Sequence, residues 1–232
     1  MTPEPGTGLR LSRATFASMV TERLRDSIVN GALEPGSQLS EVELAHSFGV
    51  SRGPVREAVQ RLVQEGLLRS EPHRGVFVPV LTNEDVADVY LARQALESAA
   101  VRYAIASSTS GTTYEALDEC VTQMETAAAA GDWEAVGRFD LDFHTALVAS
   151  TGSQRLQRMF TTVISETRLC LGALTGAEGR HDLVAEHRKI CEWIRDGDTE
   201  RALAALVRHF DDAVVALTST QGRGGVVAAD GR

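Results

Sequence analysis

The sequence predicts a mainly helical protein, with an N-terminal winged helix-turn-helix followed by an all-helical antiparallel bundle of about six helices. Two observations predict this class. Short helical patterns run into a hairpin pattern near residue 80, and only long helical patterns follow. The charge is also uneven: the formal net charge is -9, but residues 1–79 hold 9 basic and 9 acidic residues, so the whole excess lies in the remainder.

Composition excludes several classes of protein. A chain of 232 residues that is 43% hydrophobic and 24% charged is typical of folded globular proteins and not of disordered ones. No run approaches the roughly 20 apolar residues of a membrane-spanning helix, and the first 13 residues lack the apolar core of a secretory signal. Cys120, Cys170 and Cys191 are odd in number and show no CxxC spacing, so we expect reduced thiols in a cytoplasmic protein.

The first elements are three short helices. Apolar residues at helical spacing predict the first helix over residues 14–30. Ser40 and Glu43 form a capping-box pattern that opens a short second helix, which ends at Gly49. A third helix begins at Ser51 after only a tight turn, so the second and third helices have the layout of a helix-turn-helix.

A hairpin is expected after the third helix. Gly66 is a natural helix C-cap, and two short apolar runs, 67–70 and 76–80, flank the turn EPHRG. The DNA-binding domain is therefore expected over residues 13–79, followed by a hinge at 80–83.

The remainder is expected to be helical over residues 84–219. Thr82 and Asp85 form a second capping box, and glycines interrupt the helical pattern at regular points. Gly-, Pro- and Ala-rich tails are expected over residues 1–12 and 220–232. The expected helices run from Thr82 to about Ser107 and over 112–130, 132–149, 153–175, 181–196 and 199–219.

The third helix carries polar residues suited to reading DNA. A helix in the major groove buries one face and exposes long polar side chains near its N-terminus. Arginine can bind guanine edges or phosphates, glutamine can bind adenine, and a serine at the first turn can hold a phosphate. A hairpin tip with basic residues and glycine suits an approach to the adjacent groove. The expected DNA-binding residues are Ser51, Arg52, Arg56, Gln60, Arg61, His73, Arg74 and Gly75. An ordinary solvated arginine-rich helix is the alternative.

Polar residues also occupy apolar stripes of the expected bundle. Asp140 and His144 lie one helical turn apart, while His187 and His209 lie on the apolar stripes of two other helices. One carboxylate and three imidazoles suit a divalent transition metal such as Zn, Ni or Mn. The alternative for each histidine is a core side chain satisfied by hydrogen bonds.

Two arginines are candidates for binding an anionic effector. Arg93 lies on an apolar stripe, and Arg168 lies beside apolar residues of its own helix. A guanidinium in an apolar pocket suits the recognition of a small carboxylate. The alternative for Arg93 is an i, i+4 ion pair with Glu97 on a partly exposed face.

Segments of both domains resemble a known family. The run SEVELAHSFGVSRGPVREAVQRLVQEGLL with HRGVFV resembles the DNA-binding domain of GntR-type bacterial transcription regulators. The segments VYLARQALE, FDLDFHTALVASTG and EHRKICEWIRDGD resemble the FCD effector domain of the FadR subfamily. This resemblance implies a homodimer that binds a palindromic operator and responds to a small effector. It also implies DNA contacts for Arg52, Arg56 and the wing, and a metal held by one Asp and three His.

The sequence therefore predicts a transcription regulator, a repressor, whose operator binding is modulated by a small carboxylate at the metal site. Two alternatives stay open. One is a hydrolase-like metalloenzyme with an appended DNA-binding module, because an Asp/His site with open coordination can activate water. The other is a regulator that senses the metal itself.

Overall fold

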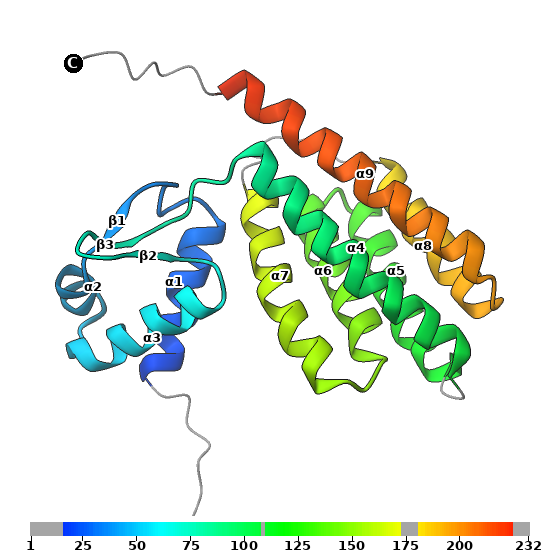
Figure 1. Ribbon diagram of the computed structural model, residues 1–232, viewed down its shortest axis with the longest axis horizontal. Coiled ribbons are helices and arrows are strands. Elements are labelled where there is room, and N and C mark those ends of the chain that lie inside the picture. Colours follow the sequence, from blue (N-terminus) through cyan, green and yellow to red (C-terminus); the bar gives the residue numbers. More distant parts are fainter. Residues whose placement is uncertain (1–15, 108–109, 173–180, 225–232) are drawn as a thin grey trace, which may run out of the picture. The chain divides into compact units, whose positions relative to one another are not determined.

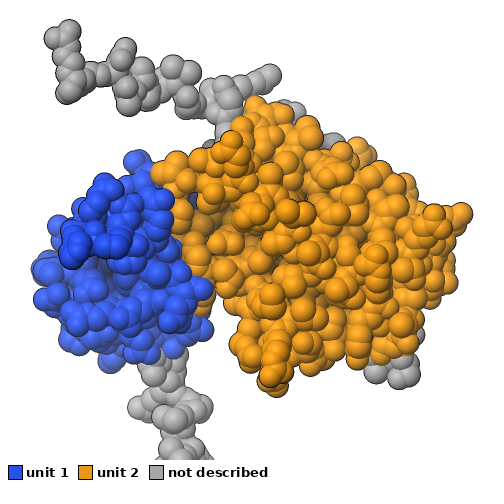
Figure 2. Space-filling model, in the orientation of Figure 1, with its two compact units in different colours: residues 1–64, 68–78 blue, residues 65–67, 79–232 orange. Residues whose placement is uncertain are grey.

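The computed structural model describes residues 16–107, 110–172 and 181–224. It divides into two compact units, coloured separately in Figure 2. The first unit comprises residues up to 64 together with 68–78, and the second comprises residues 65–67 and the chain from Pro79 onward. No described helix has the length and apolarity needed to cross a membrane.

The first unit is a winged helix-turn-helix. Helices α1 (Phe16–Val29), α2 (Glu41–Phe48) and α3 (Arg52–Gln64) accompany a small antiparallel sheet (Figure 1). The sheet has the order β1-β3-β2, with β1 at Gln38–Leu39, β2 at Arg69–Glu71 and β3 at Gly75–Phe77. Its core is apolar, since the side chains that α1 and α3 turn toward each other, Leu24, Ile28, Val55 and Leu62, are buried.

The turn between α2 and α3 forms as the local sequence dictates. The Ser40 hydroxyl accepts a hydrogen bond from the Glu43 amide at the start of α2, as the capping pattern predicts. Gly49 ends α2 with a φ of 64°, in the left-handed region that favours glycine, and its amide donates to the carbonyl oxygens of Ala45 and His46. The chain can therefore reverse within a few residues and start α3 at Arg52.

The second unit is a bundle of helices, and the predicted fold class is confirmed. Thr82 and Asp85 form a complete capping box at the start of α4, with the Thr82 hydroxyl accepting from the Asp85 amide at 3.1 Å. Helix α4 packs against α7 and α9, and α5 packs against α6 and α8. The helices are α4 (Asn83–Ala106), α5 (Ser110–Ala129), α6 (Trp133–Ala149), α7 (Gln154–Gly172), α8 (His181–Arg195) and α9 (Thr199–Gly224).

Two details differ from the sequence pattern. Strand β1 was not predicted, because a two-residue strand is too short to show a period; its register on β3 pairs Gln38 with Phe77. Helix α9 continues to Gly224, although the apolar period stops near residue 219, because glycine and polar residues carry no periodic signal. The expected end of α7 near residue 175 and the tail before residue 13 lie outside the described residues.

Candidate metal centre and nucleic-acid interface

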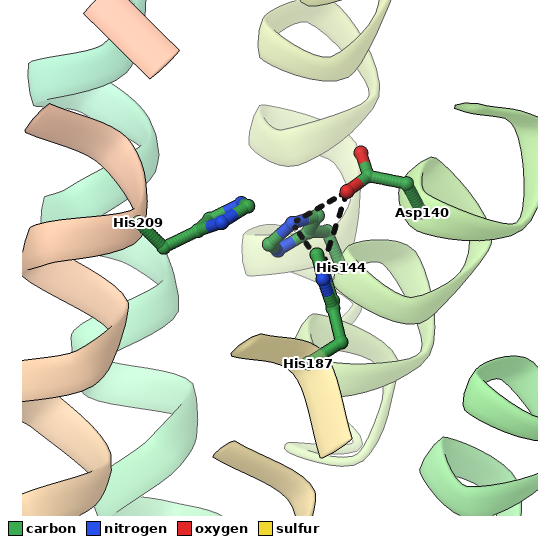
Figure 3. A group of neighbouring side chains, drawn as sticks. All are labelled: Asp140, His144, His187 and His209. Carbon is green, nitrogen blue, oxygen red and sulfur yellow. Dashed lines mark hydrogen bonds and ion pairs between the residues drawn. The ribbon is translucent and has the colours of Figure 1, made fainter. Parts of the chain in front are cut away.

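Four buried polar side chains meet inside the helical bundle. Asp140 and His144 come from α6, His187 from α8 and His209 from α9 (Figure 3). One ligand atom from each lies within 4.8 Å of the others. The structure thus brings together the four residues that the sequence marks as metal ligands, from three helices separated by up to about 70 residues of chain.

Hydrogen bonds fix how each imidazole is oriented. In all three histidines the Nδ1 atom faces an acceptor on the outer side of the cluster, so this nitrogen carries the ring proton and donates it. The acceptors are the Glu97 carboxylate for His144, the Leu183 carbonyl oxygen for His187 at 2.8 Å and the Glu186 carboxylate for His209 at 3.0 Å. The Nε2 atoms of the three rings are therefore left as lone-pair donors that face inward.

In the neutral tautomers that these outer contacts favour, the inward-facing nitrogen atoms carry no proton. The His187 Nε2 lies 3.1 Å from Asp140 Oδ1 and 3.3 Å from the His144 Nε2, and Asp140 Oδ1 is buried without a hydrogen-bond donor among the described residues. Lone pairs that approach this closely in a buried site repel each other unless a cation lies between them. The arrangement could bind a metal ion in place of the proton that would otherwise lie between His187 Nε2 and Asp140 Oδ1.

The electrostatics of the cluster also favour a positive charge beside Asp140. Burial alone would raise the pKa of the Asp140 carboxyl, but the contact with His187 and the neighbouring imidazoles hold this pKa well below its ordinary range. Burial lowers the pKa of His144 and lowers that of His209 to about 4, so both rings are neutral and able to act as ligands. Burial opposes a charge on His187 as well, but Asp140 raises the pKa of this ring.

Arg93 lies beside this cluster on α4. Its guanidinium is buried against two aromatic rings, with its central carbon 4.6 Å from the centre of the Phe210 ring and 5.1 Å from that of Tyr90. Its Nε donates to Glu97 at 3.0 Å, so the i, i+4 pair exists, but on a fully buried face and not on a partly exposed one. Its Nη2 is buried without a hydrogen-bond partner among the described residues, which leaves a cationic donor for a further anion.

Arg168 is placed differently from Arg93. It lies on α7 and is only half-buried. Among the described residues, no hydrogen bond or ion pair joins it to Asp140 or to the three histidines. Of the two arginines, Arg93 is therefore the one that forms an ion pair with a residue beside the cluster, Glu97, among the described residues.

The outer face of α3 carries the residues predicted to bind DNA. Ser51 precedes the helix, and the side chains of Arg52, Arg56, Gln60 and Arg61 are all exposed. Two of these arginines converge on Glu41 at the start of α2, with the Arg56 Nε at 3.3 Å and the Arg52 Nη2 at 3.8 Å from Glu41 Oε2. Glu41 thus holds both guanidinium groups on one side of α3, where a phosphate or base could replace it.

The tip of the β2–β3 hairpin presents the three predicted wing residues. His73 has a φ of 62° and Gly75 a φ of 104°, so the turn forces both into the left-handed region. Arg74 between them is 72% exposed and lies 5.5 Å above the Phe77 ring. The side-chain amide of Gln38 donates a hydrogen bond to the Arg74 carbonyl oxygen, which connects β1 to the hairpin tip.

Comparison with known proteins decides what these two units belong to. Residues 16–78 match the model described as bacterial regulatory proteins, gntR family, and residues 88–212 match the FCD domain. The chain is a GntR-family transcription regulator with an FCD domain. The winged helix-turn-helix (wHTH) unit of this GntR regulator is its DNA-binding part, and the bundle that holds the Asp/His cluster is its FCD domain.

Individual relatives of the GntR regulator share both units. The HTH-type regulator YdhC of Bacillus subtilis (strain 168) is 31% identical over 82% of this chain and 85% of its own length. The "Probable D-xylose utilization operon transcriptional repressor" of Paenarthrobacter nicotinovorans is 30% identical over 96% of this chain and 97% of its own. A solved structure, a "putative transcriptional regulator GntR" from Rhodococcus sp. RHA1, is 31% identical with a TM-score of 0.74 and covers 88% of this chain and 97% of its own.

These relatives settle one alternative. They are transcription regulators and not enzymes, so the GntR regulator is not the metalloenzyme that an Asp/His cluster alone left open.

Two carboxylates in the FCD domain were missed as parts of the cluster. Glu97 appeared in the sequence only as a partner for Arg93, yet it also accepts from His144, 47 positions further along the chain. Glu186 accepts from His209 across 23 positions. Helical spacing cannot reveal pairs so far apart in the chain, and the only available signal was a carboxylate on the buried stripe of α4.

Proposed function

We propose that this GntR regulator is a repressor that binds operator DNA as a homodimer, and that a small carboxylate metabolite modulates this binding from a metal site in the FCD domain. The observation that carries the proposal is the convergence of three imidazole rings and the Asp140 carboxylate on one buried point, with ligand atoms within 4.8 Å of one another. A repressor role is supported by the Paenarthrobacter relative that is named as a repressor.

The metal in this proposal is a divalent transition ion, Zn, Ni or Mn. Three imidazole nitrogens and one carboxylate oxygen suit these ions, whereas Ca and Mg prefer an all-oxygen shell. When bound, the ion would supply a Lewis acid that can accept a carboxylate oxygen. Asp140, His144, His187 and His209 would hold it, and Glu97 and Glu186 would keep two of the rings in the binding tautomer.

Arg93 is the proposed second anchor of the carboxylate. A buried guanidinium nitrogen without a partner is costly, and a ligand carboxylate would satisfy it with a charge-assisted hydrogen bond. The aromatic rings of Tyr90 and Phe210 and the ion pair with Glu97 hold the guanidinium in place for this contact. Arg168 remains a proposed effector residue on the sequence alone.

Operator binding is assigned to the outer face of α3 and to the wing. In this proposal Arg52, Arg56, Gln60 and Arg61 enter the major groove, Ser51 holds a phosphate, and His73, Arg74 and Gly75 reach the neighbouring groove. Residues 13–79 form the DNA-binding domain, 80–83 the hinge and 84–219 the effector domain. A homodimer suits this assignment, because two-fold symmetry matches a palindromic operator.

The proposal is tested by measuring operator affinity with and without carboxylates. Selection from random DNA duplexes would first supply the site, and fluorescence anisotropy would then give its Kd in the presence of a panel of mono-, di- and hydroxycarboxylates. We expect at least one acid to weaken operator binding by the metal-loaded protein and to have a much smaller effect on the Arg93→Ala variant. If no acid changed the operator Kd but adding or removing the metal alone did, the protein would be a metal sensor and not a carboxylate sensor.

A further inference from the structure

Helix α4 exposes an unpartnered stripe of residues on the face opposite its buried polar ones. Leu91 is 63% exposed and is continuous with an apolar recess lined by Leu203 and Val207. The residues that share its side of the helix recur at alternating spacings of three and four, which is the pattern of a helix that packs along another helix. They are Asp88, Leu91, Ala95, Ser98 and Arg102.

A groove lies next to Leu91. It has a volume of about 380 Å³, and its α4 side is formed by Gln94 and by four residues of the stripe, Leu91, Ala95, Ser98 and Arg102. Leu203 and Val207 of α9 form its opposite wall, since α4 and α9 pack side by side. The small side chains of Ala95 and Ser98 leave the groove open. The face therefore combines a protruding leucine with an apolar recess.

The charges on this stripe are arranged symmetrically. Asp88 precedes Ala95 by seven residues and Arg102 follows Ala95 by seven residues, which is two helical turns in each direction. Neither side chain forms an ion pair with any other residue that the structure describes. A two-fold axis through Ala95 would make the two α4 helices antiparallel. It would place Asp88 of each copy opposite Arg102 of the other copy.

The same axis would also bring the apolar side chains of the two copies into contact. Leu91 lies one turn before Ala95, so the second copy's Leu91 would lie one turn after it, beside Ser98 and above the groove wall formed by Leu203 and Val207. A self-complementary patch of this kind is what an isologous interface requires, because each half must supply both the protrusion and the recess.

We infer that this face, defined as Asp88, Leu91, Ala95, Ser98 and Arg102 with Leu203 and Val207, binds a second copy of the chain with α4 packed antiparallel to its counterpart. The inference rests on the proposed homodimer and adds the surface and register through which it forms. It pairs Asp88 of each copy with Arg102 of the other and seats each Leu91 in the other copy's groove.

A charge-swap experiment tests the register in the full-length protein. The dimer dissociation constant would be measured by sedimentation velocity for wild type, Asp88→Arg, Arg102→Asp and the double variant. We expect each single variant to weaken the dimer at least tenfold, since it places like charges opposite each other, and the double variant to restore it. Circular dichroism and metal content, unchanged in all four proteins, would show that the fold is intact.

Oxidative cross-linking locates the axis independently. Ala95→Cys should form a disulfide-linked dimer, since identical residues on a close two-fold axis can bring their Cα atoms within the roughly 4.4–6.8 Å that a disulfide spans. Ala204→Cys, an exposed alanine of α9, is the matched control and should stay largely uncross-linked.

The outcomes separate this inference from the proposed function. Wild-type protein that stays monomeric at all concentrations would overturn the homodimer and this face together. A wild-type dimer that is unaffected by both single charge variants, with no Ala95→Cys cross-link, would overturn the α4 face and leave the homodimer intact.

Discussion

Glu97 connects the metal ligands to the proposed anion site. Its two carboxylate oxygens bind different partners, Oε1 the Arg93 Nε and Oε2 the His144 Nδ1, and all three side chains are buried. Burial alone would raise the pKa of Glu97, but His144 and Arg93 together lower it, so the group stays ionised. Because one carboxylate orients both the metal ligand His144 and the Arg93 guanidinium, we expect metal binding and anion binding to depend energetically on each other.

Replacing Glu97 should therefore weaken metal binding without removing a ligand. Glu97→Gln keeps the shape of the side chain but takes away the charge that holds the proton on His144 Nδ1. We expect metal affinity to fall about 10–100-fold, as is usual when such a supporting carboxylate is lost. Competition with a chromophoric chelator would measure it. Glu115→Gln, on the exposed face of α5, is the control, and equal affinities of the two variants would exclude this role for Glu97.

At the scale of single elements, the turn between α2 and α3 determines whether α3 is presented to DNA. Gly49 is required there because its φ of 64° is strained for any residue with a Cβ. Gly53 lies in the first turn of α3 with an ordinary helical conformation, and a Cβ added to it would meet no atom within 4 Å. Of these two glycines, only Gly49 therefore has a backbone conformation that requires glycine.

Alanine substitutions at these two positions should lower stability by different amounts. Gly49→Ala should lower the free energy of unfolding of the DNA-binding unit by about 1 kcal/mol, because alanine disfavours the left-handed conformation. Gly53→Ala should cost less than this, because the better helix propensity of alanine offsets part of the restriction that Pro54 places on the residue before it. Urea denaturation followed by circular dichroism would compare them, and equal destabilisation by both would contradict the assigned role of Gly49.

The sequence was sufficient to predict elements whose signal is local or periodic. The capping pairs at Ser40 and Thr82 and the inward positions of His187 and His209 could all be predicted from spacing along one helix. What spacing could not supply is contact between helices. The second role of Glu97, the pairing of His209 with Glu186 and the contact of Glu41 with the α3 arginines depend on how separate elements pack, which no periodic pattern records.

At the scale of the whole molecule, the overall charge of -9 hides two different parts. The chain up to residue 79 is neutral, with five of its nine arginines on α3 and the β2–β3 hairpin, and the FCD part carries the acidic excess. An acidic body repels the DNA backbone, so binding must depend on the few arginine-bearing surfaces of the wHTH. Phosphate contacts of this kind release counterions, and their strength falls steeply as salt is added.

Operator affinity should consequently be strongly salt-dependent. If the two wHTH units of a dimer contact about 6–10 phosphates, raising the salt concentration from about 50 to 200 mM should lower the affinity by about 10³–10⁵-fold. Arg56→Ala should reduce the slope of log K against log salt by about one if this side chain contacts a phosphate, or cost about 1–3 kcal/mol at every salt concentration if it reads a base. An affinity for the operator that is the same for wild type and Arg56→Ala at all salt concentrations would remove Arg56 from the interface.

The central claim is that Asp140, His144, His187 and His209 hold one metal ion, and elemental analysis of the purified protein tests it most directly. Mass spectrometry of acid-digested samples would count metal atoms per chain after equilibration with Zn, Ni or Mn and removal of the excess. The account predicts one ion per chain in wild type and in the His46→Ala His73→Ala variant, whose two histidines are exposed, and almost none in His187→Ala His209→Ala. Equal metal content in the two double variants, or no bound metal in wild type, would contradict it.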